Sequence, residues 1–389
     1  MLFSKRPNRR WAVPAVALLG VVGVGAVPSL INTAGASVPN LPVLTPAELL
    51  AKARTTQVPA LSGTVTLTSN LGLPSLGSLG GLAGGSANTI TTLLAGTHSA
   101  QVWIDGADHV RIATSAPLAE TNWIRNGTDL WSYDSATQRV LHATIAADAH
   151  DSSTVSATSA PDPAHETPAE FAKELLDEVT PSTGVTVDAN RIVAGRAAYQ
   201  LTLTPNSDVS TVKAVTIAVD AATGLPLDVT IRAASTGDVA LEFGFSDVSF
   251  NAPAASTFAF TPPPGSTVKE AGDPSALLDP AQGNARHRRR SGPDASGSAV
   301  VTPGDTTSTM AKPQIVGQDW SSIAVVAKGS VPAQVNGLLS AAPRITAGTL
   351  SGRLLSTNLF NAVFLDDGRV VIGALTPSAL EGAIAALPQ

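Results

Sequence analysis

The side chains that could do chemistry in this sequence are few and scattered. The sequence has 0 cysteines, which excludes disulfides, thiolate metal ligands, thiol catalysis and lipidation of an N-terminal cysteine. It contains no Gly-x-Ser-x-Gly elbow, no phosphate-binding loop after a strand and no His-Glu-x-x-His motif. None of the six histidines has a partner at a metal-ligand spacing: His98, His109, His142, His150, His165 and His287. The sequence therefore predicts a non-enzyme with no catalytic residue, no metal site and no cofactor.

One segment, Asp-Gly-Ala-Asp-His at 105–109, places two carboxylates close to a histidine. Such a set could ligate a metal, but aspartate and glycine are also the residues that a tight turn requires. The apolar segments QVWI and VRIA flank it on either side. We interpret the segment as a hairpin turn between two strands.

Apolar side chains suggest a different chemistry, the binding of a ligand by burial. Trp103, Trp123 and Trp131 cluster in the first strand-like segments and either line a ligand cavity or belong to the core. Seven further apolar residues alternate along strand-like segments and are predicted to face the same hollow: Val65, Leu67, Tyr199, Leu201, Leu241, Phe243 and Phe245.

The elements that must position these residues are mainly strands. GTVTLTS, AYQLTLT, LDVTIRA and LEFGF alternate apolar and polar residues with period two, which predicts antiparallel strands with one solvated face. Turn sequences stand at 125–129, 220–226 and 366–369. Roughly ten strands are expected between Ser62 and Phe250. A sheet of this size curls, and its incompletely covered concave face would be an apolar cavity.

Helices are expected at three Thr-Pro sequences, which begin at Thr45, Thr167 and Thr376. Threonine is a good N-cap and proline a good first helical residue, and the first two also carry Glu three residues after the cap. The helices from Thr167 and Thr376 are amphipathic and should pack on an apolar surface. The fold class predicted is therefore α+β, a curled antiparallel sheet with a few covering helices.

The composition along the chain predicts four regions. Residues 1–36 are basic and then apolar, and form either a signal peptide cleaved after Ala-Gly-Ala at 34–36 or an N-terminal membrane anchor. Residues 40–268 form the sheet domain, 269–312 a disordered linker, and 313–389 a small C-terminal α+β unit. The linker carries RHRRR at 286–290, either a solvated charge cluster or a contact with anionic lipid or wall polymer. The net charge of −6 implies no nucleic-acid partner.

Three segments resemble LolA-like proteins. VTIAVDAATGLPLDVTIRA at 215–233 is similar to the strand, Asp-x-x-Thr-Gly-Leu-Pro turn and returning strand of that family. FAFTPPPGSTV at 258–268 resembles its Phe-x-Phe-x-Pro-Pro-x-Gly-x-x-Val ending, and TNWIRNGTDLWSYDSATQRV at 121–140 resembles one of its hairpins. The resemblance covers 40–268 and is closest to the high-GC Gram-positive branch, labelled outer-membrane lipoprotein carrier LolA or MucB/RseB-like.

This resemblance implies an open half β-barrel, closed on one side by helices, whose apolar hollow accepts acyl chains. The function it implies is a non-catalytic, extracytoplasmic carrier of an acyl lipid or lipoprotein that works at the membrane surface. The alternative is an RseB-like envelope-stress sensor that binds a membrane protein, an anti-sigma factor, with a transporter as another possible membrane partner. The sequence departs from the Gram-negative carriers in its insertion at 70–94, its linker and its C-terminal unit.

The insertion NLGLPSLGSLGGLAGG combines apolar side chains with residues that oppose helix and strand. Its leucines are Leu71, Leu73, Leu76, Leu79 and Leu82. A connection of this length at the rim of a half-barrel suggests an apolar lid that covers the hollow or wraps an acyl chain. Two other interpretations remain open: a low-complexity loop without function, and a segment whose leucines enter a membrane leaflet.

Overall fold

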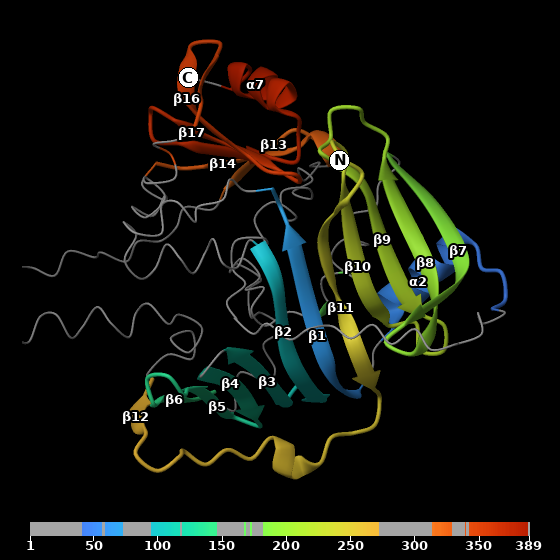
Figure 1. The fold of residues 1–389 in the computed structure, drawn as a ribbon, viewed down its shortest axis with the longest axis vertical. Coiled ribbons are helices and arrows are strands. Elements are labelled where there is room, and N and C mark those ends of the chain that lie inside the picture. The colour runs from blue at the N-terminus through green and yellow to red at the C-terminus, as the bar shows by residue number, and fades with distance from the viewer. Residues whose placement is uncertain are drawn as a thin grey trace, which may run out of the picture.

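The fold consists of two separate sheets (Figure 1). The computed structural model describes residues 41–56, 59–72, 95–116, 119–145, 167–168, 172, 182–271, 313–328, 339 and 342–387. Within these residues there is a 12-stranded sheet and a 6-stranded sheet. The second sheet lies at one end of the first (Figure 1).

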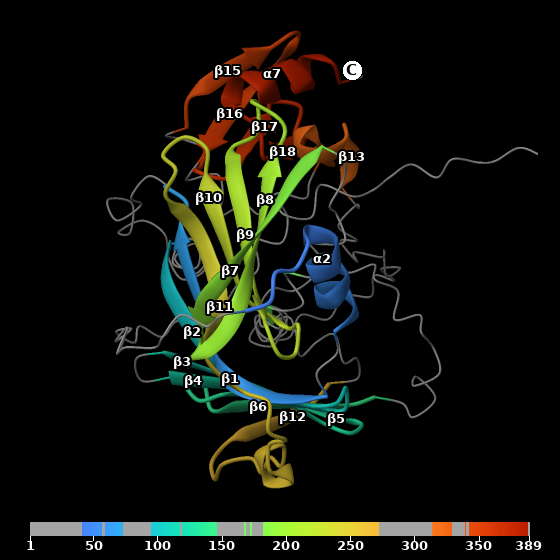
Figure 2. The ribbon, with the colours of Figure 1, turned by 90° about the vertical axis from the view of Figure 1, so that its right-hand side faces the viewer.

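The large sheet is antiparallel except at one edge and is not closed into a barrel. Its strands, in spatial order, are β12 (Thr267–Glu270), β6 (Arg139–Thr144), β5 (Asp129–Asp134), β4 (Ala119–Asn126), β3 (His109–Ala116), β2 (Ala95–Asp105), β1 (Ala60–Asn70), β11 (Val239–Ser249), β10 (Pro226–Ala233), β9 (Val212–Asp220), β8 (Arg196–Pro205) and β7 (Thr183–Val193). Among the described strands, β12 alone pairs in parallel, with β6. The sheet curls around α2 (Pro46–Thr55), as Figure 2 shows. The predicted curled, open antiparallel sheet is confirmed.

Local sequence accounts for these strands and turns. Threonines alternate with Val65 and Leu67 along β1, and these two residues pair with Phe245 and Phe243 of β11. The three predicted turns join β4 to β5, β9 to β10 and β17 (Asn361–Leu365) to β18 (Val370–Gly373). The Asp-Gly-Ala-Asp-His segment joins β2 to β3, so its interpretation as a hairpin turn is also confirmed.

Helix α2 begins where the Thr-Pro signal places it. Thr45 caps the helix, its hydroxyl accepting from the Glu48 backbone N–H at 3.3 Å while the Glu48 carboxylate accepts from the Thr45 N–H at 2.8 Å. The helix is tied to the β9–β10 turn, because Lys52 donates to the Ala221 carbonyl at 2.6 Å. The apolar side of α2 therefore faces the inside of the curl.

The second sheet has the order β13 (Gln314–Val316), β14 (Ile323–Val326), β18, β17, β16 (Leu350–Ser356) and β15 (Arg344–Ala347). Helix α7 (Pro377–Ala385) packs on it through Leu380 and Ile384, which are both fully buried. The predicted helix from Thr376 is thus confirmed. Before β14 begins, Asp319–Ser321 form a 3₁₀ turn.

The two sheets share one apolar core and several hydrogen bonds. Trp320 and Phe360 of the second sheet's region belong to the same buried cluster as Leu203 and Val215 of the first. The Thr211 N–H donates to the Ala374 carbonyl at 3.0 Å, and the Thr376 N–H donates to the Val209 carbonyl at 2.8 Å. The second sheet is therefore docked against the end of β8 and β9 and the β8–β9 connection.

The second sheet also holds the first residues of the leucine-rich insertion. The Asn358 backbone N–H donates to the Leu71 carbonyl at 2.7 Å, and its side-chain amide donates to the Asn70 carbonyl at 2.9 Å. Leu71 itself is buried in the shared core. The start of the insertion is thus fixed by contacts with the second sheet.

We expect Thr183→Val to weaken the junction of the sheets. The buried Trp320 indole N–H donates to the Thr183 hydroxyl at 2.9 Å, and valine removes this acceptor with little change of volume. A buried donor that loses its partner costs about 1–3 kcal/mol in the free energy of unfolding, measurable by urea titration. Thr186→Val, at an exposed position of the same strand, is the control. Equal stabilities of the two variants would contradict the prediction.

Several sequence predictions lie outside the described residues. These are the signal peptide or anchor, nearly all of the helix from Thr167, and most of the linker, of which only 269–271 are described. The division into domains stays a prediction, although β12 runs to Glu270, beyond the expected end at 268. Among the described helices, none combines the length and apolarity needed to cross a bilayer.

Candidate ligand-binding face

Cross-strand pairing assigns the side chains of the large sheet to two faces. Val65 lies beside Phe245 and Leu67 beside Phe243, and the row continues through Val229 and Ile217 to Leu201. Leu241 and Tyr199 alternate in phase with these residues and share their face. We call this the concave face, because it packs against α2 inside the curl (Figure 2). The opposite side is the outer face.

The concave face over β7–β10 is covered. Leu49 and Ala53 of α2 form one buried cluster with Tyr199, Leu201 and Leu241, all nearly inaccessible. The Tyr199 hydroxyl donates to the Pro42 carbonyl at 2.8 Å, so its polar atom is satisfied by the chain before the helix. These predicted site residues are core in the described structure.

The concave face over β1–β4 is covered less completely. Here a second cluster contains Val65 and Phe245 and, among the described residues, includes no residue of α2 or α7. Four half-buried apolar side chains pack at its border: Ala100, Ile104, Val110 and Trp123. Leu130 and Leu141, also half-buried, extend the same face to β5 and β6. This apolar surface, built by strands, is the candidate binding face.

The sequence analysis missed part of this face. Val110, Leu130 and Leu141 were not among the predicted site residues. Their signal was available, because the turns at 106–108 and 127–128 fix the registers of β2–β3 and β4–β5. The β4–β5 register leads from Trp123 through Arg125 to Leu130, and the β2–β3 register leads from Ile104 to Val110. Leu141 follows from Ser132 through the β5–β6 register.

The three tryptophans do not share one face of the sheet, as the lining of a single cavity would require. Trp123 pairs with Ile112 on the concave face, whereas Trp103 and Trp131 share a row with Arg111 and Ile124 on the outer face. The physical reason is the period of two: 123 and 131 lie on adjacent strands whose register puts Trp131 opposite Ile124. Only Trp123 remains at the candidate face.

The two outer-face tryptophans have structural partners. The Arg111 guanidinium lies 5.4 Å from the Trp103 ring centroid. Trp131 stacks on His142 with centroids 3.9 Å apart, and His142 lies 2.8 Å from the Glu270 carboxylate and 3.1 Å from that of Asp129. These contacts hold β12 at the sheet edge. In the described part of the chain, no group of three or more His, Asp or Glu side chains could hold a metal ion.

The predicted lid can be followed only at its first leucine. Leu71 is buried in the shared core rather than free to move over the sheet. Leu73, Leu76, Leu79 and Leu82 lie outside the described residues, so the lid remains a hypothesis. If it exists, it starts after Gly72, whose φ is +66° and which touches the Asn358 side chain.

Comparisons with known proteins give similar structures but no related sequence. Neither a family model nor a curated protein matches this sequence. Pseudomonas aeruginosa MucB, solved as its complex with MucA, aligns over 86% of this chain and 94% of its own, with 14% identity and a TM-score of 0.37. The LolA superfamily protein NE2245 from Nitrosomonas europaea aligns over 56% of this chain and 99% of its own, with 13% identity and a TM-score of 0.22.

A third solved structure, a putative outer membrane lipoprotein-sorting protein domain from Vibrio parahaemolyticus, aligns over 52% of this chain and 90% of its own. It shares 12% identity with this chain and gives a TM-score of 0.19. The chain is similar to MucB-like and LolA-like proteins.

Proposed function

We propose that this protein is a non-catalytic carrier that binds one acyl chain of a lipid or lipoprotein on the concave face of its large sheet. The observation that carries the proposal is the half-buried apolar surface around Trp123, Val110 and Leu141. Burying an acyl chain there would supply about 0.8 kcal/mol per methylene group. Leu73, Leu76, Leu79 and Leu82 would add apolar area if the insertion closes over the chain.

The opposite placement of two tryptophans gives a matched test. Trp123→Ala removes a large apolar contact from the concave face, and we expect affinity for a dansyl-labelled fatty acid to fall about tenfold, which corresponds to about 1.4 kcal/mol. Trp103→Ala removes a similar side chain from the outer face and should leave the affinity unchanged. Equal losses in the two variants, both still folded, would exclude the concave face as the binding surface.

The cargo is best identified on protein purified from its own host without detergent. Native mass spectrometry should show a bound mass that extracts into chloroform. A protein that stays free of ligand after incubation with host lipids would contradict the carrier function. It would favour the alternative sensor, which should then co-purify with one membrane protein.

The site of action that we propose is outside the cytoplasm. The proposal rests on the basic and apolar residues of 1–36, which have the composition of an export signal. Fusing 1–40 to an enzyme that is active only after export would test it, and absence of activity would exclude export by this segment.

A further inference from the structure

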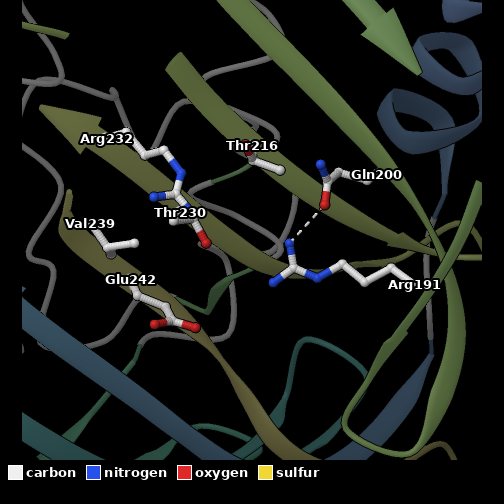
Figure 3. A pocket seen from close by; sticks show the side chains of 7 residues that line it. All are labelled: Arg191, Gln200, Thr216, Thr230, Arg232, Val239 and Glu242. Carbon is white, nitrogen blue, oxygen red and sulfur yellow. Dashed lines mark hydrogen bonds between the residues drawn. The ribbon is translucent and has the colours of Figure 1, made fainter. Parts of the chain in front are cut away.

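A second candidate site lies on the outer face of the large sheet, away from the proposed acyl site. It is a pocket of about 290 Å³ that spans β7 to β11. Figure 3 shows its lining, in which two arginines reach from opposite sides over a floor of threonine. The lining residues are Arg191, Gln200, Thr216, Thr230, Arg232, Val239 and Glu242.

The floor of the pocket is one cross-strand row. Thr216 pairs with Thr230, which pairs in turn with Glu242. Both threonines are buried, with exposed fractions of 7% and 5%, and their hydroxyls belong to the outer face. The Thr216 hydroxyl, at this depth and flanked by guanidinium groups, is a suitable donor to a bound oxyanion.

Two hydrogen bonds hold the Arg191 side chain in place. Arg191 donates to the Gln200 side-chain oxygen at 3.0 Å and to Asp228 Oδ1 at 3.2 Å. Asp228 is buried and also accepts from the Thr230 hydroxyl at 3.1 Å. Gly244 leaves room for this carboxylate, since a Cβ there would stand 2.6 Å from Asp228 Oδ2. These contacts use two of the five guanidinium N–H groups and leave the others available.

Arg232 and Glu242 form the other side of the pocket. Arg232 donates to the Gly237 carbonyl at 3.2 Å, which leaves most of its donors available. Glu242 makes no hydrogen bond or ion pair with another residue of the described chain and is exposed. Two guanidinium groups therefore share the site with two carboxylates, those of Asp228 and Glu242. Their formal charges cancel, so a ligand with no net charge fits better than a bare anion.

We propose that this pocket binds a zwitterion that joins an oxyanion to an ammonium group, with the phosphodiester glycerophosphoethanolamine, which has no net charge, as its water-soluble form. Arg191, Arg232 and the Thr216 hydroxyl contact the phosphate, and Glu242 contacts the ammonium. The same chemistry is offered by the free compound and by the headgroup of phosphatidylethanolamine. This site is independent of the acyl-chain proposal, because it lies on the opposite face of the sheet.

The test compares two ligands by isothermal titration calorimetry on the full chain. Wild-type protein should bind glycerophosphoethanolamine at least tenfold more tightly than inorganic phosphate. Glu242→Gln should abolish this preference, and Arg232→Gln should weaken both ligands at least tenfold. Arg344→Gln, an exposed arginine of the second sheet, should change neither affinity.

Three results would overturn the proposal: no heat of binding with wild-type protein at millimolar ligand, equal affinities for the two ligands, or no effect of Glu242→Gln. A flotation assay distinguishes the lipid headgroup from the free compound as the ligand. It compares vesicles of phosphatidylcholine that contain phosphatidylethanolamine with vesicles of phosphatidylcholine alone. Binding to the first vesicles alone, lost in Glu242→Gln, identifies the headgroup, whereas calorimetric binding without flotation identifies the free compound. Trp123→Ala should leave the calorimetric result unchanged, so failure of one proposal does not affect the other.

Discussion

Replacing Asp220 by alanine should lower the free energy of unfolding by about 2–4 kcal/mol, because a buried carboxylate that accepts four hydrogen bonds is removed while its partner Arg196 stays 30% exposed. Asp220 is 1% exposed and ends β9 at the Asp-x-x-Thr-Gly-Leu-Pro turn. Its two oxygens accept from Arg196 at 2.6 and 3.0 Å, and from the Thr223 N–H and hydroxyl at 2.7 Å each. Alanine leaves all four donors without this partner. Urea unfolding measures the loss.

The direction of the Asp220 pKa agrees with this expectation. Burial alone would raise it, but hydrogen bonds from Arg196 and Thr223 outweigh burial and hold the pKa below the ordinary value of 3.8. A depressed pKa means that the stabilisation is present above that value and is lost as the pH falls below it. Asp220→Ala should therefore reduce the acid sensitivity of folding as well as the stability at neutral pH.

A matched control exists in the second sheet. Arg344 and Asp366 also form an ion pair, but both side chains are more than half exposed. Asp366→Ala should cost at most about 1 kcal/mol, since exposed pairs are hydrated and screened. If Asp220→Ala cost no more than Asp366→Ala, the turn would not depend on the buried pair.

The turn around Asp220 also explains why much of the fold could be predicted. Its sequence requires a sharp reversal, and the strands on either side alternate with period two, so strand, turn and face follow from local chemistry. The capping box at Thr45 and the Thr-Pro start at Thr376 are local signals of the same kind. Such signals need no knowledge of distant residues.

Most features that sequence did not predict depend on distant contacts. The tryptophans are an exception, because the turn at 127–128 fixes the β4–β5 register, which places Trp123 and Trp131 on opposite faces. The outer-face pocket joins residues from five strands, so its residues are separated by up to 51 positions in sequence, from Arg191 to Glu242. The docking of Trp320 against Thr183 likewise spans 137 positions. No periodicity within a segment could indicate these contacts.

Asp228 should make the protein less stable as the pH rises from about 4 to 7. Burial, together with the negative charge of Glu242, raises the pKa of Asp228 to about 6 from 3.8, although Arg191 acts in the opposite direction. In this window the folded state binds more protons than the unfolded state, so stability falls with rising pH. A shift of about two pKa units corresponds to about 3 kcal/mol, as an upper limit for this group.

Asp228→Asn removes this titration while it keeps the size of the side chain and one oxygen that can accept from Thr230. The variant and the wild type should have similar free energies of unfolding near pH 4, where the wild-type carboxyl is protonated. The variant should then gain stability over the wild type as the pH rises, by up to about 3 kcal/mol at pH 7.5. Urea titrations at four pH values between 4 and 7.5 measure this difference.

Glu242→Gln provides the control, because Glu242 is one cause of the raised pKa. It should shift the pH-dependent loss of stability to lower pH without abolishing it. If Asp228→Asn were instead less stable than the wild type at pH 7.5 and equal to it at pH 4, the Arg191 pair would outweigh burial. The same protonation affects the pocket: once Asp228 is neutral, the charge of Arg191 is uncompensated, so affinity for sulfate, which stays a dianion over this range, should rise below pH 6.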